Sequence, residues 1–383
     1  MKVIRKIAAL LLVMAMVLTV TGCLHQKDEI AVTVGDAKFT SAYYMCALIN
    51  ARTEAQAKVM ENLTEEEQET QEFDVYSKQI DGKKYVDWIE ARAIEIIKEN
   101  AAYRLLCKQN NVELTKEELS NVEANASLAW YGDSSDPYTL PEYLYFDPDG
   151  DEGTDDNGVS YKTYLSFRKD LAYKEKYFDS LYSKDGKNAI SDEDVKKTIY
   201  ENFVIADVLD AAYEEGADDE SKAALKTKLE AYAKELQEGK KTFEQVYADY
   251  NNEENHSHEN DAEDGPKDAH AAVFGTEATK YVFGEQVIDY NTSYYSKINS
   301  MKVGEAVVMD NKDGTGLVLF FKRDITADPY YVTNLDINAR HIIADEDFAK
   351  ILEDYMKNLK PEINDYAIGQ FDVEDIKDPY ATE

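Results

Sequence analysis

The sequence predicts an α+β protein with a mostly helical domain and a second, mixed domain. Apolar residues recur every three or four positions in long segments, above all over residues 83–110, which indicates amphipathic helices. Residues 202–213, 307–309 and 317–321 instead carry β-branched and aromatic runs that are typical of strands. At 383 residues the chain has room for two or three domains of about 150 residues each. We expect the helical domain over residues 31–200 and 330–383, and the mixed domain over residues 203–323.

The charge balance limits the classes of partner. The chain has 42 Lys and Arg residues against 77 Asp and Glu residues, a formal net charge of −35 at pH 7. Such a surface repels phosphate groups, so neither nucleic acid nor an anionic membrane surface is expected as a partner. Apolar residues still make up 44% of the chain, with 28 Tyr and 13 Phe, so the sequence can bury real cores and is not a disordered acidic polymer.

The N-terminus has the features of an export signal. Basic residues precede an apolar run over residues 7–20, which is shorter than the roughly 20 residues of a comfortable membrane span. The run ends in Val-Thr-Gly directly before Cys23, which resembles the lipobox of bacterial lipoproteins. The resemblance implies a lipoprotein signal peptide over residues 1–22, a lipid on Cys23 and a tether over residues 23–30. The protein would then be extracytoplasmic, held at the outer face of the cell membrane by this lipid alone. The alternative is an ordinary secretory signal that happens to contain a cysteine.

The helical domain has clear local boundary signals. Residues 29–51 predict a strand, a glycine-containing turn and a helix that starts near Ser41. The long amphipathic helix that follows is expected to end at the asparagine pair 110–111. Thr115 and Glu118 then form the capping-box pattern that starts another helix.

The second half of this domain is interrupted by an acidic stretch. Residues 132–160 concentrate turn formers and acidic residues, so we expect a surface insertion there. Helical periodicity resumes near Tyr161 and continues to about Tyr182. Ser191 and Asp194 repeat the capping pattern at the start of a further helix.

Residues 203–323 predict a compact module in the order β, α, α, loop, β, β. Its two helical pieces are broken at Gly239, and its last two strands form a hairpin with a turn over residues 311–316. After Pro329 the pattern predicts one more short strand and a final helix, which Pro361 stops.

Two cysteines remain after Cys23. Cys46 and Cys107 both lie in helical patterns, and we expect two buried thiols that act as small apolar side chains. A disulfide between them is the alternative in an extracytoplasmic protein. Neither neighbourhood is electropositive enough to suggest a nucleophile.

Three segments, taken in order, resemble the extracytoplasmic foldases of the PrsA/SurA type. The long helix, turn and second helix of that family's N-terminal domain are similar to AIEIIKENAAYRLLCKQNNVELTKEEL, and the helix before its isomerase domain is similar to ISDEDVKKTIYENF. The segments of a parvulin domain follow one another here in the same order as in that family. They are a helix, Gly239, the segment TFEQVYADYN, an acidic loop, and the segments VGEAV and GLVLFFKR. The resemblance implies a SurA_N-like helical chaperone domain and a parvulin-like peptidyl-prolyl isomerase domain of the FKBP/rotamase-like α+β class.

The resemblance also places two positions that matter for isomerase activity. Parvulins carry one histidine in the first strand and another in the last, and the corresponding positions here hold Val208 and Val318. Valine donates no hydrogen bond, so we expect a valine pair in the core and weak or lost isomerase activity. The stretch NARHIIADEDFA also reads like a parvulin first strand, with His341 in place, but too few residues follow for a second such domain. We assign it to the final strand and helix.

Two acidic loops contain candidate metal ligands. His256, His258 and His270 lie amid carboxylates, and these ligand types would suit zinc. The loop offers no evident rigid frame, so a solvated acidic loop is expected and no metal or cofactor is predicted.

The other acidic loop resembles a calcium-binding loop only in part. Asp147, Asp149 and Asp151 alternate as EF-hand ligands do, but Glu152 and Gly158 stand where that motif needs Gly and Glu. A solvated acidic loop is expected, with weak calcium binding as the alternative.

These observations lead to an expected function. No nucleophile elbow or phosphate-binding glycine loop is present in the sequence. We expect a chaperone whose aromatic side chains bind apolar segments of unfolded or partly folded exported proteins. The alternatives are an active parvulin-type isomerase with a remodelled pocket, and a lipoprotein that binds a ligand or assembles with a membrane complex. A hydrophobic cleft among the N-terminal helices would favour the chaperone, and a polar convergent pocket would favour the ligand binder.

Overall fold

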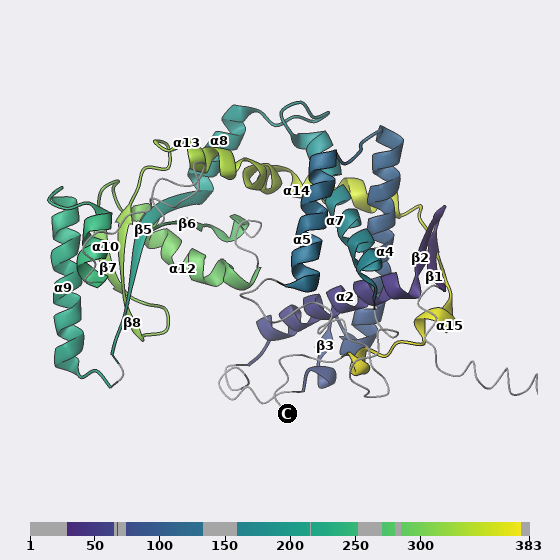
Figure 1. Ribbon diagram of the computed structural model, residues 1–383, viewed down its shortest axis with the longest axis horizontal. Coiled ribbons are helices and arrows are strands. Elements are labelled where there is room, and N and C mark those ends of the chain that lie inside the picture. Colours follow the sequence, from purple (N-terminus) through teal and green to yellow (C-terminus); the bar gives the residue numbers. More distant parts are fainter. Residues whose placement is uncertain are drawn as a thin grey trace, which may run out of the picture. The chain divides into compact units, whose positions relative to one another are not determined.

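The computed structural model has a mixed α+β architecture, as predicted (Figure 1). Contacts between elements divide the chain into two compact units. Unit 1 comprises Met1–Ser180 and Ala349–Glu383, and unit 2 comprises Leu181–Phe348. The residues that the structure describes are 29–64, 67, 74–132, 159–214, 216–251, 270–279 and 285–376.

Helices form most of the described part of unit 1. The main ones are α2 (Ser41–Glu61), α4 (Tyr85–Asn110), α5 (Lys116–Tyr131) and α7 (Tyr161–Tyr182), with the end of α14 (Asp336–Met356) and the short α15 (Asp365–Ile368). Unit 1 also contains two 3₁₀ turns, η1 (Val75–Ser77) and η3 (Val373–Asp375). It contains in addition a hairpin of β3 (Gln79–Ile80) and β4 (Lys83–Lys84).

A small antiparallel sheet brings the two ends of unit 1 together. β1 (Ile30–Val34) lies between β2 (Ala37–Thr40) and β9 (Pro361–Ile363). Val32 pairs with Phe39 on one side and with Ile363 on the other. The turn between β1 and β2 needs a left-handed residue, which Gly35 supplies at φ +59°.

The predicted helix boundaries in unit 1 are confirmed. α2 starts at Ser41, and α7 runs from Tyr161 to Tyr182. Asn111 ends α4 in the left-handed conformation, at φ 54°. Thr115 and Glu118 form both hydrogen bonds of the capping box at the start of α5.

The core of unit 1 contains a polar network that links three helices. Asp170 of α7 is 1% exposed and accepts hydrogen bonds from Tyr43 of α2 and from the Nε and Nη2 atoms of Arg104 of α4. Asn100 donates a hydrogen bond of 2.9 Å to the Tyr43 hydroxyl. Apolar side chains surround the network, so the polar contacts fix how α2, α4 and α7 pack.

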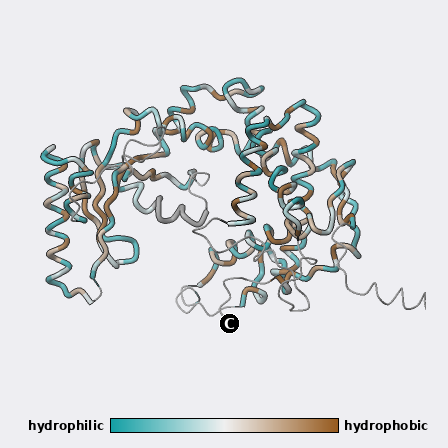
Figure 2. The backbone as a smooth tube through the Cα atoms, viewed as in Figure 1, coloured by the Kyte–Doolittle hydropathy of each residue, from teal (hydrophilic) through white to brown (hydrophobic). Residues whose placement is uncertain are grey.

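Unit 2 is organised around an antiparallel sheet with the strand order β6-β5-β8-β7. Its strands are β5 (Phe203–Ala212), β6 (Ala271–Gly275), β7 (Ala306–Asp310) and β8 (Gly316–Lys322). The β7–β8 hairpin was predicted, and Met309 pairs with Val318 across it. The strands are mainly hydrophobic, whereas α9 on one side of them is mainly hydrophilic (Figure 2).

Helices cover both faces of this sheet (Figure 1). On one face, α9 (Asp219–Gln237) and α10 (Phe243–Asn251) pack against Leu209, Leu317 and Leu319. On the opposite face, α12 (Glu285–Ser300) packs against Val318 and Phe320. Alternation of side chains along each strand produces the two cores.

The module contains more elements than the sequence pattern predicted. Gly239 separates α9 from α10 as expected, at φ 64°. β6 and α12, together with the 3₁₀ turn η2 (Glu277–Thr279), were missing from the predicted order. β6 has only five residues, which is too short for a distinct strand pattern. α12 does carry an amphipathic pattern, and the sequence prediction missed it.

The boundary between the units differs from the expected domain boundary. Unit 2, rather than the helical unit, contains α8 (Asp192–Asn202), α13 (Pro329–Asn334) and the first part of α14. The reason is a small apolar core in which Ile199 and Tyr331 pack with Phe203 and Ile205 of β5.

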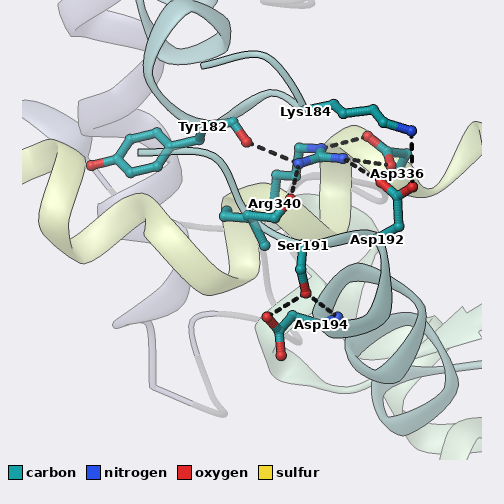
Figure 3. Close-up of polar contacts among 8 residues, drawn as sticks. Tyr182, Lys184, Ser191, Asp192, Asp194, Asp336 and Arg340 are labelled. Atoms are coloured by element: carbon teal, nitrogen blue, oxygen red, sulfur yellow. Dashed lines mark hydrogen bonds and ion pairs between the residues drawn. The ribbon is translucent and has the colours of Figure 1, made fainter. Parts of the chain in front are cut away.

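The predicted final strand is wrong, because its residues lie in α14. Arg340, which is 4% exposed, forms a two-point ion pair with Asp336 one helical turn before it. Its Nη1 donates hydrogen bonds to the carbonyl oxygens of Tyr182 at 2.9 Å and Ile190 at 3.0 Å (Figure 3). His341 pairs with Asp345 in the same i, i+4 manner, at 2.8 Å. The helix ends at Met356, before Pro361, which begins β9.

Arg340 also fixes the segment that leads into α8. The side chain of Ser191, the predicted N-cap, accepts a hydrogen bond from the Asp194 amide at 3.1 Å (Figure 3). Asp192, the first residue of α8, lies 4.0 Å from Nη2 of Arg340 and also pairs with exposed Lys184 at 3.1 Å. The guanidinium therefore holds together the segment before α8, the start of α8 and α14.

Both remaining cysteines are free and buried, which confirms the predicted thiols. Burial raises the pKa of the Cys107 thiol from 9.0 to about 11, although the charge of Lys176 opposes the rise. Burial also raises the pKa of the Cys46 thiol well above its ordinary range.

Arg340→Ala should lower the free energy of unfolding by about 3 kcal/mol, because the ion pair with Asp336 and the hydrogen bonds to the Tyr182 and Ile190 carbonyl oxygens are lost together. Urea denaturation followed by circular dichroism measures the change. Lys184→Ala is the matched control, since an exposed ion pair contributes about 0.5 kcal/mol. Equal stability of the two variants would contradict the role given to Arg340.

In a Cys23→Ser variant, a thiol reagent should label Cys46 and Cys107 slowly at about pH 8 and rapidly after unfolding. The folded state holds the Cys107 proton more tightly than the unfolded state does. The protonated Cys107 thiol therefore contributes to stability below pH 9.0, and this contribution is lost as the pH rises towards about 11. Rapid labelling of both thiols in the folded protein at about pH 8 would contradict their burial.

Candidate functional site

The face of the unit 2 sheet beneath α12 contains both positions that the sequence singled out. Val318 lies on β8 and is fully buried, whereas Val208 lies on β5 and is half-buried. Val208 pairs with Phe320 and Asp210 pairs with Val318, so the two valines are diagonal neighbours on adjacent strands. Both belong to the same apolar core, as expected of a valine pair on an inner sheet face.

Aromatic rings fill the space next to the two valines. Phe320 packs against Phe274 with a centroid distance of 5.6 Å and against Tyr294 of α12 at 5.0 Å. Burial raises the pKa of the Tyr294 hydroxyl and of the Asp210 carboxyl at the end of this face. The arrangement can hold apolar surface, but the two valines supply no hydrogen-bond donor to a substrate.

The candidate histidines are only partly within the described ranges. His256 and His258 lie outside them, as do Asp147, Asp149, Asp151 and Cys23. His270 stacks on Tyr247 of α10 with a centroid distance of 3.9 Å, and its carbonyl oxygen accepts a hydrogen bond from the Val208 amide at 3.0 Å. Within the described residues, no group of three or more His, Cys, Asp or Glu side chains is arranged to hold a metal ion.

Sequence reasoning missed a buried ion pair on the other face of β5. Asp207 is fully buried between Ile205 and Leu209, and the Nη1 of Arg323 donates to its two carboxylate oxygens at 3.3 and 3.1 Å. Burial raises the pKa of nearby Tyr331 to about 12, and the Asp328 and Asp207 carboxylates add to the rise. A charged residue in the middle of an apolar strand was the signal that could have revealed this pair.

Unit 1 exposes a group of apolar side chains where α5 ends and α7 begins. We call this group the aromatic surface and define it as Leu128, Trp130, Tyr131 and Tyr161. Leu128 is 54% exposed and Tyr131 is 64% exposed. The Tyr161 ring packs against Tyr131 at 5.5 Å and against Trp130 at 5.8 Å.

The aromatic surface is anchored to the core beneath it. Trp130 also packs against Tyr164, which is buried, with a centroid distance of 5.6 Å. The Tyr161 hydroxyl donates a hydrogen bond to the carbonyl oxygen of Glu123 at 3.3 Å. These contacts hold the rings in place, so they present a preformed apolar surface.

A polar pocket of about 870 Å³ lies elsewhere in unit 1, next to η1, α4 and η3. Its lining includes Lys78, Glu90, Phe371 and Asp372. Burial raises the pKa of the Glu90 carboxyl, and the Asp87 and Asp372 carboxylates raise it further. The pocket is a convergent polar site rather than a hydrophobic cleft.

Two of the solved structures that are similar to this chain are foldase proteins. No family model and no curated protein matches the chain. The crystal structure of the foldase protein PrsA from Streptococcus pneumoniae str. Canada MDR_19A is 15% identical, with a TM-score of 0.34, over 77% of this chain and 98% of that one. The foldase protein PrsA from Lactococcus lactis is 10% identical, with a TM-score of 0.35, over 88% of this chain and 96% of that one.

None of the helices in the described part of the chain is both long enough and apolar enough to cross a membrane.

Val318→His should destabilise the protein by about 3 kcal/mol, because the imidazole would be larger than the space and would lack a hydrogen-bond partner. Val208→His, at the half-buried position on the same face, should cost about 1 kcal/mol or less. Urea denaturation measures both variants. If Val318→His were as stable as the unchanged protein, this face could not be a packed core.

Proposed function

We propose that the chain is a lipid-anchored extracytoplasmic chaperone of the PrsA/SurA type that binds unfolded exported polypeptides. The observation that carries the proposal is the aromatic surface of unit 1. The lipobox before Cys23 and the ordered segments that resemble this family support the localisation and the class.

The aromatic surface has the properties that binding of unfolded segments requires. Its exposed members, Leu128 and Tyr131, offer apolar area, and the anchored rings of Trp130 and Tyr161 lose little freedom when a segment binds. Apolar groups of this kind mark interaction sites on many proteins. The net charge of −35 opposes self-association of the chaperone, so an apolar surface can stay exposed.

We further propose that isomerase activity is weak or lost. Twisting a prolyl amide meets a barrier of about 20 kcal/mol, and a catalyst needs placed polar groups to lower it. The positions that hold histidine in parvulins are occupied here by Val208 and Val318, which lie in an apolar core. The packing of Val318 against aromatic rings supports a structural role for this face.

A second candidate function is ligand binding, and the polar pocket next to η1 favours it. A volume of about 870 Å³ suits a small molecule, and charged groups of both signs line the pocket. A polar ligand held there would not require the aromatic surface, so the two functions can be separated experimentally.

The protein should suppress aggregation of a chemically unfolded client, as measured by light scattering. A Leu128→Ser/Tyr131→Ser variant should bind the client roughly fivefold more weakly, since it loses about 1 kcal/mol of aromatic and apolar contact. An Ile363→Ser/Tyr366→Ser variant is the matched control, because those residues are 42% and 67% exposed elsewhere in unit 1.

Two outcomes would contradict the proposed chaperone function. One is a lack of suppression at a large excess of the protein. The other is equal loss of suppression in both double variants, which would mean that the aromatic surface has no special role.

A proline-containing peptide should show little or no acceleration of cis/trans isomerisation when the protein is added. The uncatalysed reaction takes about 10–100 s, so a stopped-flow or cooled protease-coupled assay resolves it. Rapid turnover that is abolished by substitutions within residues 203–323 would show that the module is an active isomerase with a remodelled pocket.

A further inference from the structure

A second pocket in unit 1 has a different chemical character. It has a volume of about 560 Å³ and lies between α4 and α7. Its charged lining residues are Arg104, Lys108, Glu113, Lys169 and Asp170. Three of the five are cations, in a chain where acidic residues outnumber basic ones by 77 to 42.

Arg104 is held rigidly at this pocket, with one donor edge unused. Its Nε and Nη2 atoms donate to Asp170, and Nη2 also lies 3.4 Å from the Ser166 hydroxyl. The guanidinium carbon lies 5.1 Å from the centre of the Phe39 ring, which supports the plane of the group. No described residue accepts a hydrogen bond from Nη1, and the side chain is 32% exposed.

The two lysines add positive charge that the pocket does not balance. Lys108 lies one turn after Arg104 on α4, and Lys169 precedes Asp170 on α7. Neither lysine forms an ion pair with a described residue, whereas Lys176, two turns further along α7, pairs with Glu118 at 2.7 Å. Since Arg104 neutralises Asp170, Glu113 is the one remaining acidic residue in the lining of this pocket to oppose the two ammonium groups.

We infer that this pocket binds the C-terminal carboxylate of a polypeptide. A carboxylate can accept from the free Nη1 of Arg104 while the ammonium groups of Lys108 and Lys169 neutralise its charge. The acidic surface of the protein would repel a ligand with many negative charges. At physiological ionic strength, salt screens repulsion between charges that are more than about 8 Å apart. A single carboxylate on an otherwise uncharged chain can therefore enter the pocket.

This inference deepens the proposed function, because it names the part of the client that the helical unit recognises. An apolar surface alone does not distinguish one unfolded segment from another. A carboxylate site would add a preference for free chain ends.

Isothermal titration calorimetry with a short N-acetylated peptide of Leu, Ala and Gln tests the inference. The peptide is used once with a free C-terminal carboxylate and once as the C-terminal amide. We expect the full-length protein to bind the acid about fivefold more tightly than the amide, with the difference shrinking as salt is added. Lys108→Gln/Lys169→Gln should abolish the difference, and Lys162→Gln, at an exposed position on α7, should preserve it.

Equal binding of acid and amide, no binding of either peptide, or preference for the acid in the Lys108→Gln/Lys169→Gln variant would overturn the inference. Loss of the preference with Lys162→Gln would also overturn it, because the effect would then follow overall charge. Aggregation suppression by the same preparations tests the chaperone function separately: suppression without acid preference rejects only the carboxylate site, and acid preference without suppression rejects only the chaperone.

Discussion

A buried carboxylate determines how α7 lies in unit 1. Asp170 is 1% exposed, and a carboxylate in such a place is stable only when donors surround it. Arg104 of α4 and Tyr43 of α2 supply those donors, so three helices are tied at one point. The first turn of α7 then carries Tyr161 into the aromatic surface, and Lys169 lines the pocket beside Arg104. The aromatic surface and the proposed carboxylate site therefore both depend on this ion pair.

A different constraint governs unit 2, where both faces of the sheet are covered. Alternation along β5 directs Val208 towards α12 and Leu209 towards α9 and α10. The charged residue between Ile205 and Leu209, Asp207, is compensated by Arg323 rather than exposed to a substrate. The face beneath α12 keeps a tightly packed aromatic and aliphatic core. This packing is the physical reason for proposing a structural sheet module with little isomerase activity.

The sequence predicted elements that begin or end with a strong local signal. The capping box of Thr115 was found correctly, as was the helix that starts at Tyr161. The predicted strand around Arg340 was wrong because the contacts that fix that helix include the Tyr182 carbonyl, more than 150 residues away. The two valine positions lie on strands as expected, but the aromatic surface could not be predicted, because it requires α5 and α7 to lie side by side. Only the packed helices reveal that Tyr131 and Tyr161 meet.

Hydrogen–deuterium exchange with and without an unfolded exported polypeptide tests the central claim most directly. If the helical unit binds clients at the aromatic surface, amides over residues 126–132 and 161–167 should exchange more slowly when the client is present. Amides of β5 and β8 should be unchanged, because the sheet is not proposed to contact the client. Unchanged exchange at the end of α5 and the start of α7, with new protection confined to the unit 2 sheet, would contradict the account.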